Sequence, residues 1–253
     1  MTTVQPTLAV ALLGVAVGVL TACTGAEGGA EDESTVTVLA AASLTDAFTE
    51  VADAYTDRHP GVTVRVSFGS SATLAQQVAA GADVDVFASA GEASLAQLPP
   101  ALTVADRVTT IATTTLEIAV PPGGSAEVRG LADLARADLD VVLCAETAPC
   151  GVAADAVLER AGVVAHVVSR ELDARSTLAK VALGEADAAL VYRADVVAAD
   201  DRVDGVRIPA QDNVTVGYPM VRVGDGAHAR AFVELVASET GRRVLADAGF
   251  EAP

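Results

Sequence analysis

Short runs of β-branched and aliphatic residues alternate with stretches of helical period along most of the chain. In the first part, the expected strands are residues 36–39, 62–68 and 84–88. Between the first two, apolar residues recur at helical spacing from Leu44 to Tyr55, and the run stops at Pro60. Strands that are separated by helices predict parallel βαβ units, and therefore an α/β fold.

A second series of the same kind follows. Its expected strands are residues 116–120, 141–143, 163–168 and 188–192, with helices at 152–161 and 176–183. An extended segment at 214–223 and helices at 231–236 and 243–248 end the chain. Two α/β series with a returning chain predict two lobes with a cleft between them. We expect lobe I to comprise residues 35–112 plus 209–253, and lobe II residues 113–208.

The N-terminus has the character of an export signal. Residues 8–20 form an apolar run, which ends in Leu20-Thr21-Ala22-Cys23, a sequence that resembles the lipobox of bacterial lipoproteins. We therefore expect a signal peptide at residues 1–22, lipidation of Cys23 and a flexible acidic tether at 23–34. The alternative is an ordinary signal peptide with a chance cysteine. Residues 1–22 contain no Lys or Arg, which departs from the usual signal.

The charge balance excludes some classes of partner. Sixteen Lys and Arg residues stand against 34 Asp and Glu residues, for a net charge of -18. Such a chain has no basic field for nucleic acid or for an anionic membrane surface.

The cysteines are consistent with export. If Cys23 is lipidated, Cys144 and Cys150 remain, and an even number in an oxidising compartment favours a disulfide over two buried thiols. Zinc-binding spacings are absent and the three histidines lie far apart in the sequence, so we expect neither a metal site nor a cofactor.

Two turns of the first lobe share one design. Ser43 follows the expected strand 36–39 and Ser71 follows 62–68, and each precedes a helix. A hydroxyl beside the free N–H groups of a helix start can bind an anion, and the carboxyl edge of a parallel sheet is where such folds bind ligands. The alternative is plain N-capping, because Asp46 stands three residues after Ser43 as in a capping box.

The second lobe offers matching pieces. The segments Pro149-Cys150-Gly151 and Asp173-Ala174-Arg175 both open helices and present backbone donors. Tyr192 ends the strand at 188–192, where its hydroxyl could enter the cleft; alternatively, it is a packing residue.

Several of these segments together resemble the molybdate-binding proteins of molybdate ABC importers, a type II periplasmic-binding-protein family. The similarity lies in Ala41-Ala42-Ser43-Leu44-Thr45, in Ser70-Ser71-Ala72-Thr73-Leu74 and in Val191-Tyr192-Arg193-Ala194-Asp195. It extends from about residue 35 to residue 250.

The resemblance implies a two-lobed protein that holds an oxyanion with hydroxyl and backbone N–H donors. It assigns the hydroxyls to Ser43, Ser71 and Tyr192 and the backbone donors to Cys150 and Ala174. It also implies delivery of the anion to an ABC permease with its ATPase subunit, by a monomer anchored through Cys23 to the outer face of the cytoplasmic membrane.

A donor-only pocket suits molybdate, which carries no proton at neutral pH and only accepts hydrogen bonds. Phosphate keeps a proton, and a wall without acceptors would disfavour it by roughly 1 to 3 kcal/mol. Molybdate and tungstate stay open as ligands. Another small oxyanion, such as sulfate or thiosulfate, is the alternative.

An enzyme of a different class, an exported serine hydrolase, is a remote alternative, because neither Ser43 nor Ser71 lies in a Gly-x-Ser-x-Gly motif. Residues 224–229 imitate a dinucleotide-binding fingerprint. Too few residues follow for the rest of the βαβ unit, so we expect a turn there.

Overall fold

The computed structural model describes residues 34–123 and 127–253. The expected signal peptide, the lipidation site Cys23 and the tether up to residue 33 lie outside the described residues. Ser34, which we counted in the tether, is the first residue of strand β1. No helix in the described part of the chain combines the length and the apolar composition of a membrane span.

The described residues form one sheet of nine strands, in the order β2-β1-β3-β9-β4-β7-β5-β6, with β8 paired to β4. The strands are β1 (Ser34–Ala41), β2 (Val62–Gly69), β3 (Val86–Ala88), β4 (Val108–Val120), β5 (Val141–Cys144), β6 (Val167–Glu171), β7 (Ala188–Tyr192), β8 (Asp204–Arg207) and β9 (Thr215–Arg222).

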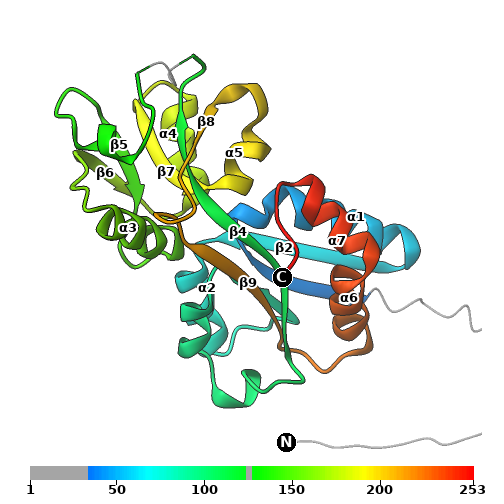
Figure 1. Cartoon of the computed structure of the whole chain (residues 1–253). Helices are drawn as coiled ribbons and strands as arrows, with labels where there is room; N and C mark the ends of the chain where they lie inside the picture. Colours follow the sequence, from blue (N-terminus) through cyan, green and yellow to red (C-terminus); the bar gives the residue numbers. More distant parts are fainter. Residues whose placement is uncertain (1–33, 124–126) are drawn as a thin grey trace, which may run out of the picture. The chain divides into compact units, whose positions relative to one another are not determined.

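Two groups of parallel strands are joined by β9 and β4, which pair antiparallel with each other and with β3 and β7, respectively. β1 is parallel to β2 and β3, and β5 is parallel to β6 and β7. The long strand β4 pairs with β9 from Val108 to Thr115 and with β7 from Leu116 to Ala119, so it passes from one group to the other (Figure 1). We call the part that contains β1–β3 lobe I and the part that contains β5–β8 lobe II. The expected lobe boundary at residue 112 falls within β4, and the boundaries remain a prediction.

Helices cover both groups of strands. They are α1 (Thr45–Arg58), α2 (Ser71–Ala79), α3 (Pro149–Ala161), α4 (Ala174–Ala182), α5 (Arg193–Ala199), α6 (Ala227–Ala237) and α7 (Glu239–Asp247). α1, α6 and α7 pack together in lobe I, where α2 packs against β1 and β3. α3, α4 and α5 pack on the strands of lobe II (Figure 1).

The central strand β1 is buried on both faces, which explains its nearly continuous apolar sequence. Val38 and Ala40 belong to the same apolar cluster as Phe48 of α1. Leu39 points the other way and belongs to a second cluster with Leu74 of α2. This double burial fixes the end of β1, and with it the turn that carries Ser43.

Some expected elements were wrong in their bounds. β4 begins at Val108 rather than 116, because a threonine-rich stretch continues the strand through the pair with β9. The strand expected at 163–168 is β6 at Val167–Glu171, and Val164 is exposed. A 3₁₀ turn, η2 (Glu92–Gln97), follows β3. The short helix α5 was not predicted from the sequence.

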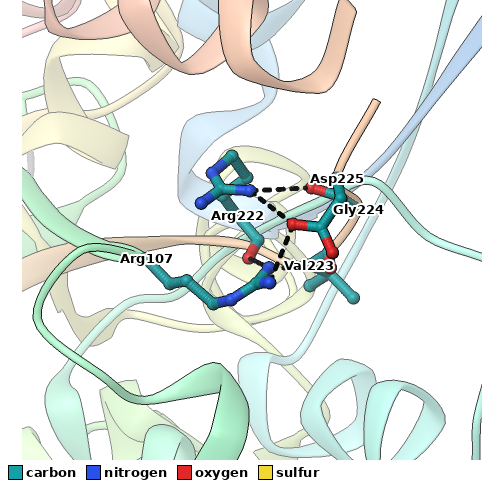
Figure 2. Close-up of polar contacts among 5 residues, drawn as sticks. All are labelled: Arg107, Arg222, Val223, Gly224 and Asp225. Atoms are coloured by element: carbon teal, nitrogen blue, oxygen red, sulfur yellow. Dashed lines mark hydrogen bonds and ion pairs between the residues drawn. The ribbon is translucent and has the colours of Figure 1, made fainter. Parts of the chain in front are cut away.

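The segment that imitates a dinucleotide fingerprint consists of a loop at 224–226, after β9, and the first three residues of α6. Figure 2 shows Arg107 and Arg222 bonded to the same oxygen of Asp225, each at 2.8 Å. Arg107 also donates to the carbonyls of Arg222 and Val223, both at 3.2 Å. Both arginines hold the pKa of the Asp225 carboxyl below its usual value. The two arginines contact carbonyls and a carboxylate of the loop. The loop is therefore a turn held by hydrogen bonds, and not a phosphate-binding loop.

Candidate functional site

One cavity lies where both lobes present the carboxyl ends of their strands. It is lined by Ala41, Ala42, Ser43, Gly69, Ser70, Ser71, Ala90, Ala148, Pro149, Cys150, Asp173, Ala174 and Tyr192. All five residues expected at the site are among them, and each is at most 6% exposed. The structure therefore brings together groups that are up to 149 positions apart in the chain, from Ser43 to Tyr192.

The cavity is small. The centre of a water molecule can move over about 10 Å³ within it. If this space is a sphere, the cavity has a radius of roughly 2.7 Å to its walls, which is room for one small polyatomic ion and not for an organic solute.

Ser43 is not a helix cap. It lies in a 3₁₀ turn, η1 (Ala42–Leu44), so that Leu44 takes the N-cap position of α1 and no side-chain cap is made. The Ser43 hydroxyl is instead 2.9 Å from the hydroxyl of Tyr218 on β9. If Tyr218 donates in this bond, the proton of Ser43 is free to point into the cavity. The capping alternative is wrong for this residue, because the 3₁₀ turn separates it from the helix start.

Ser71 is not a cap either. It is the first residue of α2, and Ser70 is the N-cap without a side-chain bond. Its hydroxyl oxygen accepts the backbone N–H of Ala90 at 2.9 Å. Because this bond uses the oxygen, the hydroxyl proton remains available to the cavity. Both serines are thus held by lobe I neighbours in a way that leaves each one able to donate.

The backbone donors of lobe II lie at two helix starts. Cys150 is the second residue of α3 after Pro149, and Ala174 is the first residue of α4. N–H groups in the first turn of a helix have no intrahelical acceptor, so both can serve the cavity. Asp173 caps α4 by accepting the N–H of Ser176 at 2.8 Å, which turns its carboxylate toward the helix.

The start of α3 is fixed by a disulfide and a glycine. Cys144 at the end of β5 is bonded to Cys150, with an S–S distance of 2.07 Å. A Cβ at Gly151 would lie 2.0 Å from the carbonyl oxygen of Ala145, so only glycine fits this close approach. The helix start therefore lies tightly against the end of the strand.

Tyr192 ends β7, and its buried side chain, which carries a hydroxyl, lines the cavity. This hydroxyl has no hydrogen-bond partner among the described residues. Burial, and then the charge of Asp195, raise the pKa of Tyr192 well above its usual value, so the phenol stays neutral and can donate. An unpaired buried hydroxyl costs about 1 to 3 kcal/mol, which a hydrogen-bond acceptor in the cavity would recover.

The electrostatics of the cavity come from dipoles. Asp173 is the only charged residue among the described residues that line it. The starts of η1, α2, α3 and α4 surround the space with the positive ends of their backbone dipoles. No histidine lines it: the ring Nδ1 atoms of His59, His166 and His228 bond to Tyr55, Leu139 and Tyr55, respectively. Ser43 and Ser71 thus have no histidine beside them in the described lining, and no group of three His, Cys, Asp or Glu residues in the described ranges could hold a metal ion.

Two residues near the site were missed as candidates. Tyr218 was not among the candidates, although it lies buried on a strand, where a polar aromatic residue needs a partner. Asp195 is fully buried in the first turn of α5, and neither carboxylate oxygen has a hydrogen-bond partner of normal geometry in the described part of the chain. A charged residue within an apolar segment could have been singled out from the sequence.

Comparisons with known proteins agree with this geometry. The profile of the bacterial extracellular solute-binding protein family matches residues 36–251. The molybdate-binding protein ModA of Mycobacterium tuberculosis is 37% identical, over 89% of this chain and 88% of that protein. ModA of Escherichia coli is 30% identical, over 87% of this chain and 90% of that protein.

Solved structures show the same fold. The periplasmic molybdate-binding protein of Azotobacter vinelandii matches with a TM-score of 0.72 and 21% identity, over 86% of this chain and 99% of that one. The sulfate-binding protein SubI of Mycobacterium tuberculosis matches with a TM-score of 0.74 and 19% identity, over 87% of each chain. The fold is thus the expected two-lobed α/β type of periplasmic binding proteins, and the chain belongs to the bacterial extracellular solute-binding protein family.

Proposed function

We propose that this protein captures molybdate, and also tungstate, outside the cytoplasm and delivers it to an ABC importer. The observation that carries the proposal is a cavity, sized for one small ion, whose available groups are hydroxyl and backbone N–H donors from both lobes. The 37% identity to ModA over nearly the whole chain supports molybdate as the ligand.

In this proposal the hydroxyls of Ser43, Ser71 and Tyr192 and the backbone N–H groups of Cys150 and Ala174 hold the anion. A dianion that only accepts hydrogen bonds satisfies all five donors. Because lobe I supplies two of them and lobe II three, all are satisfied together only when the lobes close on the ligand. Binding then shifts an equilibrium between open and closed forms toward the closed form.

Isothermal titration calorimetry with molybdate, tungstate, sulfate and phosphate tests the proposal. We expect tight, stoichiometric binding of molybdate and tungstate and much weaker binding of phosphate. A thermal unfolding scan provides a second readout, since a ligand at 100 times its Kd adds about 2.7 kcal/mol of stability. Tight binding of sulfate alone would mean that sulfate, and not molybdate, is the ligand. The sulfate-binding protein SubI has the same fold.

The role is binding and transport rather than catalysis. We propose that the mature protein is a monomer, held at the outer face of the cytoplasmic membrane by a diacylated Cys23, with its permease and ATPase as partners. A single acyl chain anchors weakly, so the diacyl form matters. Metabolic labelling with a fatty acid should tag the wild type and not Cys23→Ala; equal labelling of both would contradict the anchor.

A further inference from the structure

An ion pair joins the two lobes beside the cavity. Arg175, the second residue of α4 in lobe II, donates from its guanidinium to the carboxylate of Asp46 in the first turn of α1 in lobe I. Arg175 directly follows Ala174, one of the expected backbone donors. The arginine side chain is 26% exposed and the aspartate 54%, so the pair lies at the rim of the cleft, where closure brings the two lobes together.

The same arginine is also the main counter-charge of a buried carboxylate. Asp195 is fully buried at the start of α5, which packs against α4. Burial raises its pKa to about 7, and the charge of Arg175 is the strongest influence that lowers it. The backbone N–H of Tyr192 also lowers this pKa, whereas Asp173 and Asp46 raise it. The charge of Asp195 in turn raises the pKa of Tyr192 and of Tyr218.

Carboxylates near the cavity would repel a bound anion. A dianion in the cavity would lie beside Asp173, and no cation lines the cavity among the described residues. Among the described residues, Arg175 is the cation that most lowers the pKa of Asp195. Its Nε atom is buried without a hydrogen-bond partner in the described ranges, so the guanidinium is held at the cleft rim without full pairing.

We propose that Arg175 is a positioning residue for anion binding: it holds the lobes together through Asp46 and balances the charge of Asp195 behind the cavity. The inference rests on the proposed function for its ligand. Its two parts predict different behaviour for the two partners. Loss of Asp46 removes only the bond between the lobes, whereas loss of Arg175 also leaves Asp195 without its counter-charge.

The release rate of molybdate, measured by stopped-flow fluorescence or by surface plasmon resonance, reports the first part. We expect both Arg175→Gln and Asp46→Asn to release the anion about 3- to 10-fold faster, as for the loss of a half-exposed ion pair. The double variant should release molybdate no faster than the single variant with the higher release rate. The charge exchange Asp46→Arg with Arg175→Asp should restore part of the loss. Lys180→Gln on the same helix removes an equal charge from an exposed pair with Glu185 and should leave the release rate unchanged.

The pH dependence of the affinity for molybdate tests the second part of the proposal, the balance of the charge of Asp195 by Arg175. Arg175→Gln should raise the pKa of Asp195, so that affinity falls more steeply than in the wild type between about pH 6 and pH 9. Asp46→Asn should make the profile flatter, because Asp46 raises this pKa. When Asp195→Asn is present in both proteins, Arg175→Gln should no longer change the pH profile of the affinity. A purely structural role of Arg175 would weaken binding equally at every pH.

A measurement without ligand separates this inference from the proposed function. The pH dependence of the thermal midpoint should change in Arg175→Gln and not in Lys180→Gln. If the wild type binds none of the tested oxyanions, the proposed function fails, while this shift would still support the balance of charge between Arg175 and Asp195. If the wild type binds molybdate and Arg175→Gln matches its release rate and both pH profiles, the inference is overturned.

Discussion

At the scale of single residues, the three hydroxyls of the cavity differ in how the protein holds them. Ser43 is bonded to Tyr218 and Ser71 to the backbone of Ala90, so each is oriented before any ligand arrives. Tyr192 has no such partner in the described part of the chain. This difference predicts opposite effects on the stability of the ligand-free protein.

Replacement of Tyr192 by Phe removes an unpaired buried hydroxyl. We expect the free protein to be as stable as the wild type or more stable by about 1 kcal/mol, and molybdate to bind roughly 10- to 150-fold more weakly. Calorimetry and thermal unfolding measure the two effects. Tyr55→Phe is the matched control, because its hydroxyl bonds to His228 far from the cavity; it should lose stability and keep its affinity. Unchanged affinity in Tyr192→Phe would make Tyr192 a packing residue.

Replacement of Ser71 by Ala should lower both the stability of the free protein and its affinity for molybdate. The backbone N–H of Ala90 loses its acceptor inside the protein, which costs about 1 to 3 kcal/mol of unfolding free energy, and the ligand loses a donor. Ser67→Ala on the exposed face of β2 serves as the control, with neither loss expected. If Ser71→Ala binds molybdate as tightly as the wild type, the hydroxyl only fastens the loop at Ala90.

At the scale of elements, the sequence predicts most of the strands and places all five candidate residues at element ends. The prediction works because β1, β5 and β7 are buried runs, and such runs are visible in a sequence. It fails for the start of β4, where threonines at 109–110 and 113–115 leave no apolar run or alternation, and the strand forms through its pairing with β9. It also cannot see the 3₁₀ turn at Ser43, since the bond to Tyr218 joins residues 175 positions apart.

The disulfide at the start of α3 gives a prediction for this element. Cys150→Ala keeps the backbone N–H at position 150 and loses the bond to Cys144, whose closed loop spans a sequence separation of 6. A loop of this size predicts a loss of about 2 kcal/mol of stability, with a smaller effect on affinity. Thermal scans with and without reductant check this: reductant should lower the midpoint of the wild type and not that of the variant. An affinity loss larger than that of Ser71→Ala would mean that the disulfide itself shapes the anion site.

At the scale of the whole molecule, the charge of the protein repels the proposed ligand, which is an anion. The protein carries a net charge of -18, and Asp195 adds a buried carboxylate behind the cavity. Affinity must therefore come from short-range donors in a site closed by both lobes. Two consequences follow, one for stability and one for binding.

The buried carboxylate makes stability fall as the pH rises. Asp195 has a pKa of about 7 in the folded protein, against a usual value of 3.8. Between these values the folded state binds a proton that the unfolded state does not, so stability is lost through this window and the loss is complete above about pH 7. Asp195→Asn should thus exceed the wild type by up to about 4 kcal/mol at pH 8 and differ little near pH 4. Urea unfolding at several pH values measures this. Asp53→Asn on the exposed face of α1 should follow the wild type, and a parallel profile in Asp195→Asn would assign the pH dependence to other groups.

The response to salt should distinguish this site from one built on cations. Where Lys or Arg side chains bind an anion, added salt screens the attraction and weakens binding. Here no cation lines the cavity within the described ranges, and the field of the whole protein repels the dianion. Salt should therefore speed association by screening this repulsion, and it should speed dissociation only as far as it screens the half-exposed pair between Arg175 and Asp46. We expect the Kd for molybdate to fall or to stay level between about 10 mM and 200 mM salt. A steady rise of the Kd over this range, with slower association, would mean that cations outside the cavity wall attract the anion, and the dipole-based site would have to be abandoned.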